Sequence, residues 1–173
     1  GDLILAKKIA FNGILIGACI SLIYSIFLGF FSINIFGLLS SSKEVIAGAV
    51  MYAEVGFGAA AITWLFFVLS SILRGFGDTY TPARAIIIAG FLQILMSGFF
   101  TLGFGDIVNL GIVGPATAMI ICHALAILLI LPKIVSSNLL LKRQSFGFDR
   151  GATWEILKVG GLGLLNSITI ALT

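Results

Sequence analysis

One carboxylic acid, Glu54, lies well inside a long apolar stretch of the sequence. Burying its charge in hydrocarbon would cost about 2.5 to 3.5 kcal/mol, so the side chain should face a polar cavity or carry a proton. Ionisable groups in such positions commonly mark proton or ion pathways. A plainer interpretation is a carboxylate near the outer rim of a membrane that reaches water. Both interpretations stay open from the sequence.

Three further polar side chains interrupt apolar stretches downstream. Gln93 and Ser97 are four residues apart, hence on one face of a helix, and could hydrogen-bond a substrate or a neighbouring helix. His123 is the only histidine and could titrate near neutrality, although a lone histidine inside a membrane more often bonds a neighbouring helix. Together with Glu54 they are the candidates for a substrate or ion pathway.

No catalytic or cofactor-binding motif accompanies these residues. The sequence holds no G-x-x-x-x-G-K-[ST], G-x-G-x-x-G or H-E-x-x-H pattern and no paired cysteines. Cys19 and Cys122 fall inside apolar runs, where the expected role is a small buried side chain. We therefore expect no enzyme activity, no metal and no cofactor. Any transport would be powered by a proton or sodium gradient.

Composition places these residues in a membrane. The 173 residues are 60% hydrophobic and 10% charged, with a mean hydropathy of +1.19. In water such a chain could not cover its apolar surface, whereas in a bilayer that surface faces lipid. The basic residues lie in short loops without interleaved aromatic side chains, which argues against a nucleic-acid partner. The sequence predicts an all-α integral membrane protein with the lipid bilayer as its partner.

Charges, glycines and prolines divide the chain into segments long enough to cross a bilayer. We expect four complete transmembrane helices and a truncated fifth, which has too few residues to cross before the sequence stops. The sequence also begins with Gly1 and lacks a signal peptide, so we expect an internal fragment of a longer protein. The expected spans are about 9–39, 46–72, 84–102 and 107–131, followed by a linker over 134–155 and the fifth segment over 156–173.

Basic residues predict the orientation of these helices. If the spans alternate sides, nine of the ten Lys and Arg residues fall on one face, and only Lys43 falls on the other. Cytoplasmic loops are the ones that retain Lys and Arg. We therefore expect a multi-pass protein of the plasma (inner) membrane, with loops 73–83 and 133–155 in the cytoplasm and loops 40–44 and 103–109 outside.

Local sequence signals predict helix starts and one packing face. Thr81 is expected to cap the third span, with Pro82 at its first helical position. Ser41 and Glu44 are expected to form a capping box before the second span. Small residues four apart predict a close contact between the first span and another helix. These residues are Gly13, Gly17, Ser21, Ser25 and Gly29.

The polar loop from Leu73 to Pro82, L-R-G-F-G-D-T-Y-T-P, resembles a loop of multidrug and toxic compound extrusion (MATE) transporters. That loop joins the family's fourth and fifth helices and reads roughly L-R-G-x-G-D-T-x-x-P. Residues 110–118 resemble the start of its sixth helix, 158–163 the start of its seventh, and Tyr52 falls where a Tyr usually opens the fourth. The matching loop residues are Arg74, Gly75, Gly77, Asp78, Thr79 and Pro82.

The resemblance implies that residues 1–133 form helices three to six of an amino-terminal six-helix lobe. The inter-lobe linker and the start of helix seven would follow. In the family, two such lobes make a twelve-helix transporter that exchanges organic cations or other amphiphiles for protons or sodium by alternating access. The implied partners are a small amphiphilic or cationic substrate and the remaining helices, before residue 1 and after residue 173.

Departures from the family pattern concern the coupling ion. The family's fifth helix often reads N-x-x-L-D, whereas the matching stretch here runs from Gln93 to Ser97 and lacks the acid. The usual Pro of helix seven is Gly163, and Glu54 could substitute for the missing acid. We expect a cation-coupled exporter of amphiphilic or cationic compounds. A flippase for lipid-linked oligosaccharides of the same superfamily and a non-transporting membrane scaffold are the alternatives.

Overall fold

The computed structural model describes residues 3–103, 109–137 and 148–171, and this part of the chain is helical. The predicted all-α fold is therefore confirmed. The predicted loop 103–109 and linker 134–155, and the ends of the fourth and fifth expected segments, lie partly outside the described residues. The elements are α1 (Leu3–Leu39), α2 (Lys43–Gly58), α3 (Ala60–Gly75), α4 (Tyr80–Leu102), the 3₁₀ turn η1 (Gly111–Val113), α5 (Gly114–Ser136) and α6 (Arg150–Ala171).

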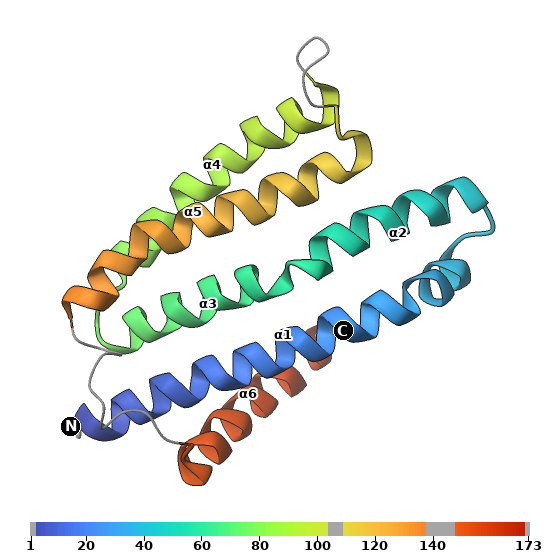
Figure 1. Ribbon diagram of the computed structural model, residues 1–173. Helices are drawn as coiled ribbons and strands as arrows, with labels where there is room; N and C mark the ends of the chain where they lie inside the picture. The colour runs from blue at the N-terminus through green and yellow to red at the C-terminus, as the bar shows by residue number, and fades with distance from the viewer. Residues whose placement is uncertain (1–2, 104–108, 138–147, 172–173) are drawn as a thin grey trace.

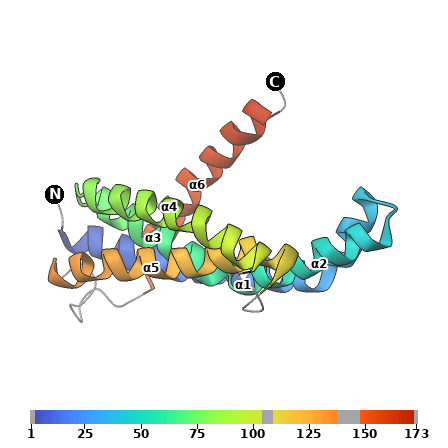
Figure 2. The same ribbon diagram turned by 90° about the horizontal axis from the view of Figure 1, so that it is seen from above.

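Five of these helices form one layer, and α6 leaves it. α1 packs on α2 and α3, α3 packs on α5, and α5 packs on α4 (Figure 1). Figure 2 shows the layer from its edge, with α6 projecting out of it after its contact with α1. The start of α1, the turn between α3 and α4 and the end of α5 gather at one end of the layer. Polar turns from distant parts of the sequence therefore meet there.

The described residues include several stretches of membrane length. Three described stretches are long and apolar enough to cross a bilayer, Leu5–Leu39, Tyr80–Leu102 and Gly111–Ser136, and the bent pair α2–α3 makes a fourth if it is one span. Large apolar side chains along them are exposed, as lipid-facing side chains must be. α1 is about 55 Å long at 1.5 Å per residue, so it must tilt or extend beyond about 30 Å of hydrocarbon.

The expected second span, 46–72, is broken near its middle instead of forming one helix. α2 and α3 meet at Ala59 with a bend of 47°. Ala59 has φ −105° and ψ 19°, outside helical values, and Gly56 and Gly58 before it weaken the helix locally. Glycines are frequent in membrane helices, so their presence alone does not predict a break. A break without proline was therefore missed.

Both predicted helix caps are wrong by a few residues. Ser42, rather than Ser41, precedes α2, and its hydroxyl accepts a hydrogen bond from the Val45 N–H. At α4 the cap is the Asp78 carboxylate, and Thr81 is one of its donors. A carboxylate is the stronger acceptor for the free N–H groups of a helix start, because it adds a charge that the helix dipole favours.

Several helices extend beyond their predicted bounds, and the extensions of α5 and α6 bear on the polar end of the layer. α5 continues through Pro132 to Ser136, past the expected end at 131. α6 begins at Arg150, ahead of the expected 156, because the side chain of Asp149 accepts from the first N–H groups of the helix. Both extensions lie at the polar end of the layer, where they bring charged residues onto helix ends.

A buried core joins α3, α4 and α5 and fixes the turn between α3 and α4. Phe66 and Leu73 of α3 and Ile130 of α5 are no more than 1% exposed. Ala85 and Ala89 of α4 complete the contact, since their small side chains let α4 approach closely. The α3–α4 turn is thus held between two helices that pack on the same core.

The predicted small-residue face of α1 is in contact at three of its five positions. A side chain at Gly17 would lie 2.8 Å from Val68 of α3, so only glycine allows this approach. Ser21 is buried, and the Ser25 hydroxyl reaches α2. A methyl group added at Gly13 or Gly29 would have no atom within 4 Å, so the contact face does not extend to these two positions.

Candidate functional site

The turn between α3 and α4 is built by a glycine C-cap. Gly77 has φ +90°, a conformation that other residues rarely adopt. Its N–H donates to the Arg74 carbonyl at 3.0 Å, and the Asp78 N–H donates to the Leu73 carbonyl at 2.9 Å. This pair of hydrogen bonds is the Schellman motif, which ends α3 and satisfies its last carbonyls. It also turns the Asp78 side chain toward the next helix.

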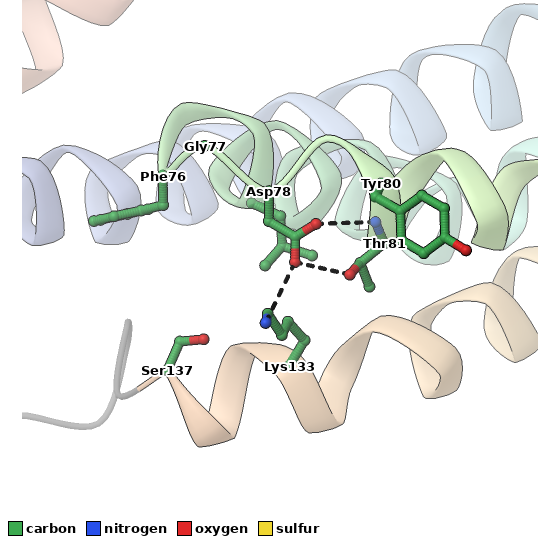
Figure 3. A pocket seen from close by; sticks show the side chains of 8 residues that line it. Phe76, Gly77, Asp78, Tyr80, Thr81, Lys133 and Ser137 are labelled. Atoms are coloured by element: carbon green, nitrogen blue, oxygen red, sulfur yellow. Dashed lines mark hydrogen bonds and ion pairs between the residues drawn. The ribbon is translucent and has the colours of Figure 1, made fainter.

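Asp78 connects three elements through its carboxylate. One oxygen accepts from the Thr81 N–H at 3.0 Å, and the other accepts from the Thr81 hydroxyl at 2.7 Å (Figure 3). Lys133 of α5 places its Nζ 3.8 Å from the second oxygen. Hydrogen bonds from Thr81, and then the charge of Lys133, hold the pKa of Asp78 below its usual range. Asp78 is therefore ionised at neutral pH and links α4 to the end of α5.

A hollow of about 540 Å³ opens beside this carboxylate. Figure 3 shows the Asp78 and Lys133 side chains meeting across it, with Phe76 and Ser137 on its other sides. The surroundings mix one ion pair with hydroxyl groups, so the site can hold polar groups. Its lining is Leu73, Phe76, Gly77, Asp78, Tyr80, Thr81, Lys133 and Ser137.

Asp149 repeats the arrangement at the start of α6. Its carboxylate accepts from the Gly151 and Ala152 N–H groups at 2.9 and 3.1 Å, which caps the helix. Lys8 of α1 lies 3.5 Å from the other oxygen. The backbone donors, chiefly Ala152, and the Lys8 charge lower the pKa of Asp149. Each capping aspartate thus pairs with a lysine of another helix.

Asn12 strengthens this second junction from inside α1. It is 1% exposed, and its side-chain oxygen accepts from the Asp149 N–H and the Thr153 hydroxyl, both at 3.2 Å. Its amide nitrogen donates to the Lys8 carbonyl at 2.9 Å. A buried amide satisfied on both ends fixes where α6 leaves the layer.

The remaining residues of the predicted loop motif support the turn in different ways. The Arg74 guanidinium donates to the Ser71 hydroxyl at 3.1 Å, and both side chains are exposed. Gly75 is the last residue of α3, Thr79 precedes α4, and Pro82 is buried in the first turn of α4. The structure brings Asp78 and Gly77 into one site, whereas Arg74 points to its own helix.

Glu54 lies on an exposed part of α2, close to the break before α3. It lines a hollow of about 490 Å³ together with Ile33 of α1 and Lys43 at the start of α2. Lys43 and Glu54 are eleven residues apart, which puts them on one face of α2 and about 16 Å apart along its axis. The acid is therefore set in a largely apolar hollow with a cation at its far end.

The other predicted pathway residues lie at one level of the layer but do not form a single cluster. Gln93 and Ser97 of α4 are partly buried, and Met96 between them contacts Cys122 of α5 at 3.8 Å between sulfur atoms. His123 follows Cys122 but packs at a tilt against the rings of Phe66 and Phe67 of α3, with its Nδ1 3.0 Å from the Met119 carbonyl. Its ring therefore faces α3, not the α4 pair.

An apolar hollow of about 520 Å³ separates α1 from α3 beside α6. Trp64 and Phe67 of α3 and Ile156 of α6 are among its lining side chains. Within the described residues, no group of three His, Cys, Asp or Glu side chains is arranged to hold a metal ion. The available chemistry is ion pairing, hydrogen bonding and apolar or aromatic contact.

Comparison with known proteins decides the family. A family model described as MatE matches residues 2–98, more than half of the chain. The chain belongs to the MatE family. This confirms the resemblance seen in the sequence. It also confirms that the chain belongs to a family of transporters and not to a class of enzymes.

Relatives and a solved structure of this family cover most of the chain. The probable multidrug resistance protein YoeA of Bacillus subtilis is 26% identical over 164 residues, 92% of this chain and 35% of that protein. An FAD transporter of Shewanella oneidensis is 30% identical over 125 residues, 72% of this chain and 27% of that protein. The chain spans about a quarter to a third of the length of the curated relatives it matches.

The fold of this MatE chain is similar to that of a multidrug resistance MATE family transporter of the MOP superfamily, solved in an inward-facing conformation. The TM-score is 0.73 at 21% identity, over 91% of this chain and 41% of that one. Together with the exposed apolar helices, the family establishes a multi-pass membrane protein surrounded by lipid.

Several contacts at the junctions were not predicted from the sequence. Lys133 and Lys8 were treated only as topology signals, and Asn12 and Asp149 were not singled out. The pattern D-x-x-T at 78–81 was available as a capping signal. The α1 partners of Asp149, Lys8 and Asn12, lie more than a hundred residues away along the chain, and no local pattern identifies such a contact.

Proposed function

We propose that the protein to which this chain belongs is a cation-coupled antiporter that exports amphiphilic or cationic compounds by alternating access. The observation that carries the proposal is the family match over residues 2–98, together with multidrug resistance proteins among the relatives. Residues 1–133 would belong to one lobe and 156–173 to the other. The capped junctions at Asp78 and Asp149 would lie on the cytoplasmic side, where basic residues are retained.

The charge distribution favours a cationic or neutral substrate over an anionic one. Lys and Arg are absent between Lys8 and Lys43 and between Arg84 and Lys133, which covers most of the membrane-length stretches. The apolar hollow beside α3 offers the Trp64 and Phe67 rings, and aromatic faces attract organic cations. We place the apolar part of the substrate there.

Glu54 is the proposed coupling residue of this part of the protein. It is a carboxylate on a membrane-length segment, and the acid of helix five is replaced by Ser97. A carboxylate in an apolar hollow can exchange a proton or sodium ion for an organic cation, because only one of them needs to neutralise it at a time. Gln93 and Ser97 would hydrogen-bond the passing substrate, and His123 would support the α3–α5 contact.

A second candidate substrate comes from one relative, which is an FAD transporter. A flavin dinucleotide is aromatic like many multidrug substrates, but it carries phosphate charge. Its transport would require basic residues from other parts of the protein, since the membrane-length stretches here have few. The same assay separates the two substrate classes.

The test is transport by the complete protein in sealed vesicles under imposed proton or sodium gradients. We expect efflux of a cationic dye, and no movement of FAD or of a lipid-linked oligosaccharide. The Glu54→Gln variant should lose coupled efflux, whereas the Glu44→Gln variant, at the start of the same helix, should keep it. Dye movement that ignores both gradients, or that is unchanged in Glu54→Gln, would contradict the coupling mechanism.

A further inference from the structure

The break between α2 and α3 is closed by a hydrogen bond from a different helix. In a continuous helix the Phe57 carbonyl would accept from the Ala61 N–H, four residues on. Here Ala59 leaves helical values, and the Phe57 carbonyl accepts from the Ser25 hydroxyl of α1, beside a local contact from the Ala59 N–H. The Tyr24 ring packs edge-on against Phe57, with 5.1 Å between ring centroids. The bent form is thus held by α1.

Both partners of this hydrogen bond have another partner within reach. The Phe57 carbonyl can return to the Ala61 N–H if α2 and α3 align. The Ser25 hydroxyl can bond a carbonyl of its own helix, as Ser21 already does with the Ala18 carbonyl at 2.8 Å. Straightening would therefore exchange one hydrogen bond for others without leaving a polar group unpaired in the membrane.

The packing around the break leaves room for such a movement. A methyl group added at Gly58 would have no atom within 4 Å. One added at Gly56 would have only the Ala116 side chain of α5 near it, at 3.9 Å. α3 has six buried residues and is anchored in the core, whereas α2 has two buried residues. The half that can move is therefore α2.

We propose that the α2–α3 break is a two-state hinge, and that the Ser25 hydroxyl sets its angle by binding the Phe57 carbonyl. Glu54 lies five residues from Ala59 on the moving half. Closing a 47° bend about Ala59 would carry the Glu54 backbone about 6 Å and the Ala47 backbone about 14 Å. Ser25 is thus a positioning residue for Glu54. Only this last link rests on the proposed function.

The hinge can be measured without transport, as a distance in the complete protein in lipid nanodiscs. With Cys19 and Cys122 replaced, spin labels at Ala47→Cys and Leu102→Cys report the position of α2 against α4. Labels at Leu65→Cys and Phe91→Cys, both on the α3–α4 part of the layer, form a reference pair that should not move. All four positions are exposed.

Removing the hydroxyl in Ser25→Ala should raise the ratio of straight to bent distances about threefold, the size typical of one hydrogen bond between membrane helices. Ser25→Thr should keep the original ratio, because it keeps the hydroxyl. Ser21→Ala is the matched control on the same helix, since the Ser21 hydroxyl bonds only its own helix. It should leave the ratio unchanged.

Two results would overturn the hinge. One is an unchanged 47–102 distance in Ser25→Ala with the reference pair intact, and the other is an equal shift in Ser21→Ala. If the reference distance between positions 65 and 91 changes in Ser25→Ala because the protein misfolds, the Gly58→Ala variant tests the hinge in its place. Alanine favours a continuous helix there and should increase the straight population, and no increase refutes the hinge. If Ser25→Ala shifts the 47–102 distance but leaves dye efflux unchanged, the hinge stands, and only the proposal that Ser25 positions Glu54 for transport is rejected.

Discussion

Gly114 at the start of α5 is the position where we expect the largest cost from one added methyl group. A side chain there would lie 2.6 Å from the Thr101 backbone nitrogen and 2.8 Å from the Phe100 carbonyl carbon. Both atoms belong to the backbone of α4 and cannot rotate away. Ordinary contacts begin near 3.4 Å, so α4 and α5 would have to separate by several tenths of an ångström. The two helices share the core that fixes the α3–α4 turn.

The magnitude follows from this overlap. Overpacking a well-packed contact costs about 1 to 3 kcal/mol, and the gain in helix propensity from Gly to Ala offsets up to about 1 kcal/mol. We expect Gly114→Ala to destabilise the protein by about 1 to 2 kcal/mol. The matched control is Gly98→Ala on α4, which has no atom within 4 Å and should be neutral or slightly stabilising.

Thermal unfolding of the complete protein in detergent would test this prediction. Cys122 is fully buried between α4 and α5, whereas Cys19 is exposed. With Cys19 replaced, a thiol-reactive dye follows the opening of this contact. Gly114→Ala should lower the midpoint by a few degrees relative to Gly98→Ala. Equal midpoints for the two variants would show that α4 and α5 do not approach as closely as described.

Three further predictions concern the junctions at the polar end. Gly77→Ala should lower the stability by about 1 kcal/mol, because φ +90° disfavours a side chain. Gly75→Ala is the control and should be neutral. Equal unfolding midpoints for the two variants would contradict the C-cap at Gly77. The lowered pKa of Asp78 means that the stability from its ionised form is present above about pH 4 and is lost as pH falls through the lower folded pKa. Thermal unfolding midpoints measured from pH 8 down to pH 3 should stay level and then fall. In an Asp78→Asn variant the fall should be smaller, because the contribution of the Asp78 carboxylate is absent. Asn12→Ala should leave the Asp149 N–H without its acceptor and should cost about 1 to 3 kcal/mol. The Thr153 hydroxyl would keep the Asp149 carbonyl as its acceptor. Asn34→Ala, on the exposed part of α1, should have no effect. The rate of protease cleavage after α5 compares the two variants, and equal rates would contradict the role of Asn12.

Much of the fold was predictable because it depends on local composition. The charge-free run after Lys8 predicts α1, and its length and apolar character require lipid around it. The start of α4 was predicted only approximately, because Thr81 and Asp78 both lie where a capping residue is expected. The choice between them depended on where the Gly77 turn directs the carboxylate.

The candidate pathway residues were predicted one by one, but not how they lie. Gln93 and Ser97 share a face of α4, as helical spacing requires, whereas His123 faces α3. The sequence contains no signal for that rotation, because it depends on which side of α5 packs against which neighbour. Glu54 lies on α2, which is half of the bent α2–α3 pair, and its position next to a break was not foreseen.

The sequence by itself determined a helical membrane protein of the MatE family, because hydropathy and the loop motif are read over short windows of the chain. Only the tertiary structure decided which lysine meets each capping aspartate, where Asn12 holds α6, and how Ser25 closes the break at Ala59. Each of these contacts joins residues far apart in sequence. Their partners are selected by the packing of whole helices, and not by the residues beside them.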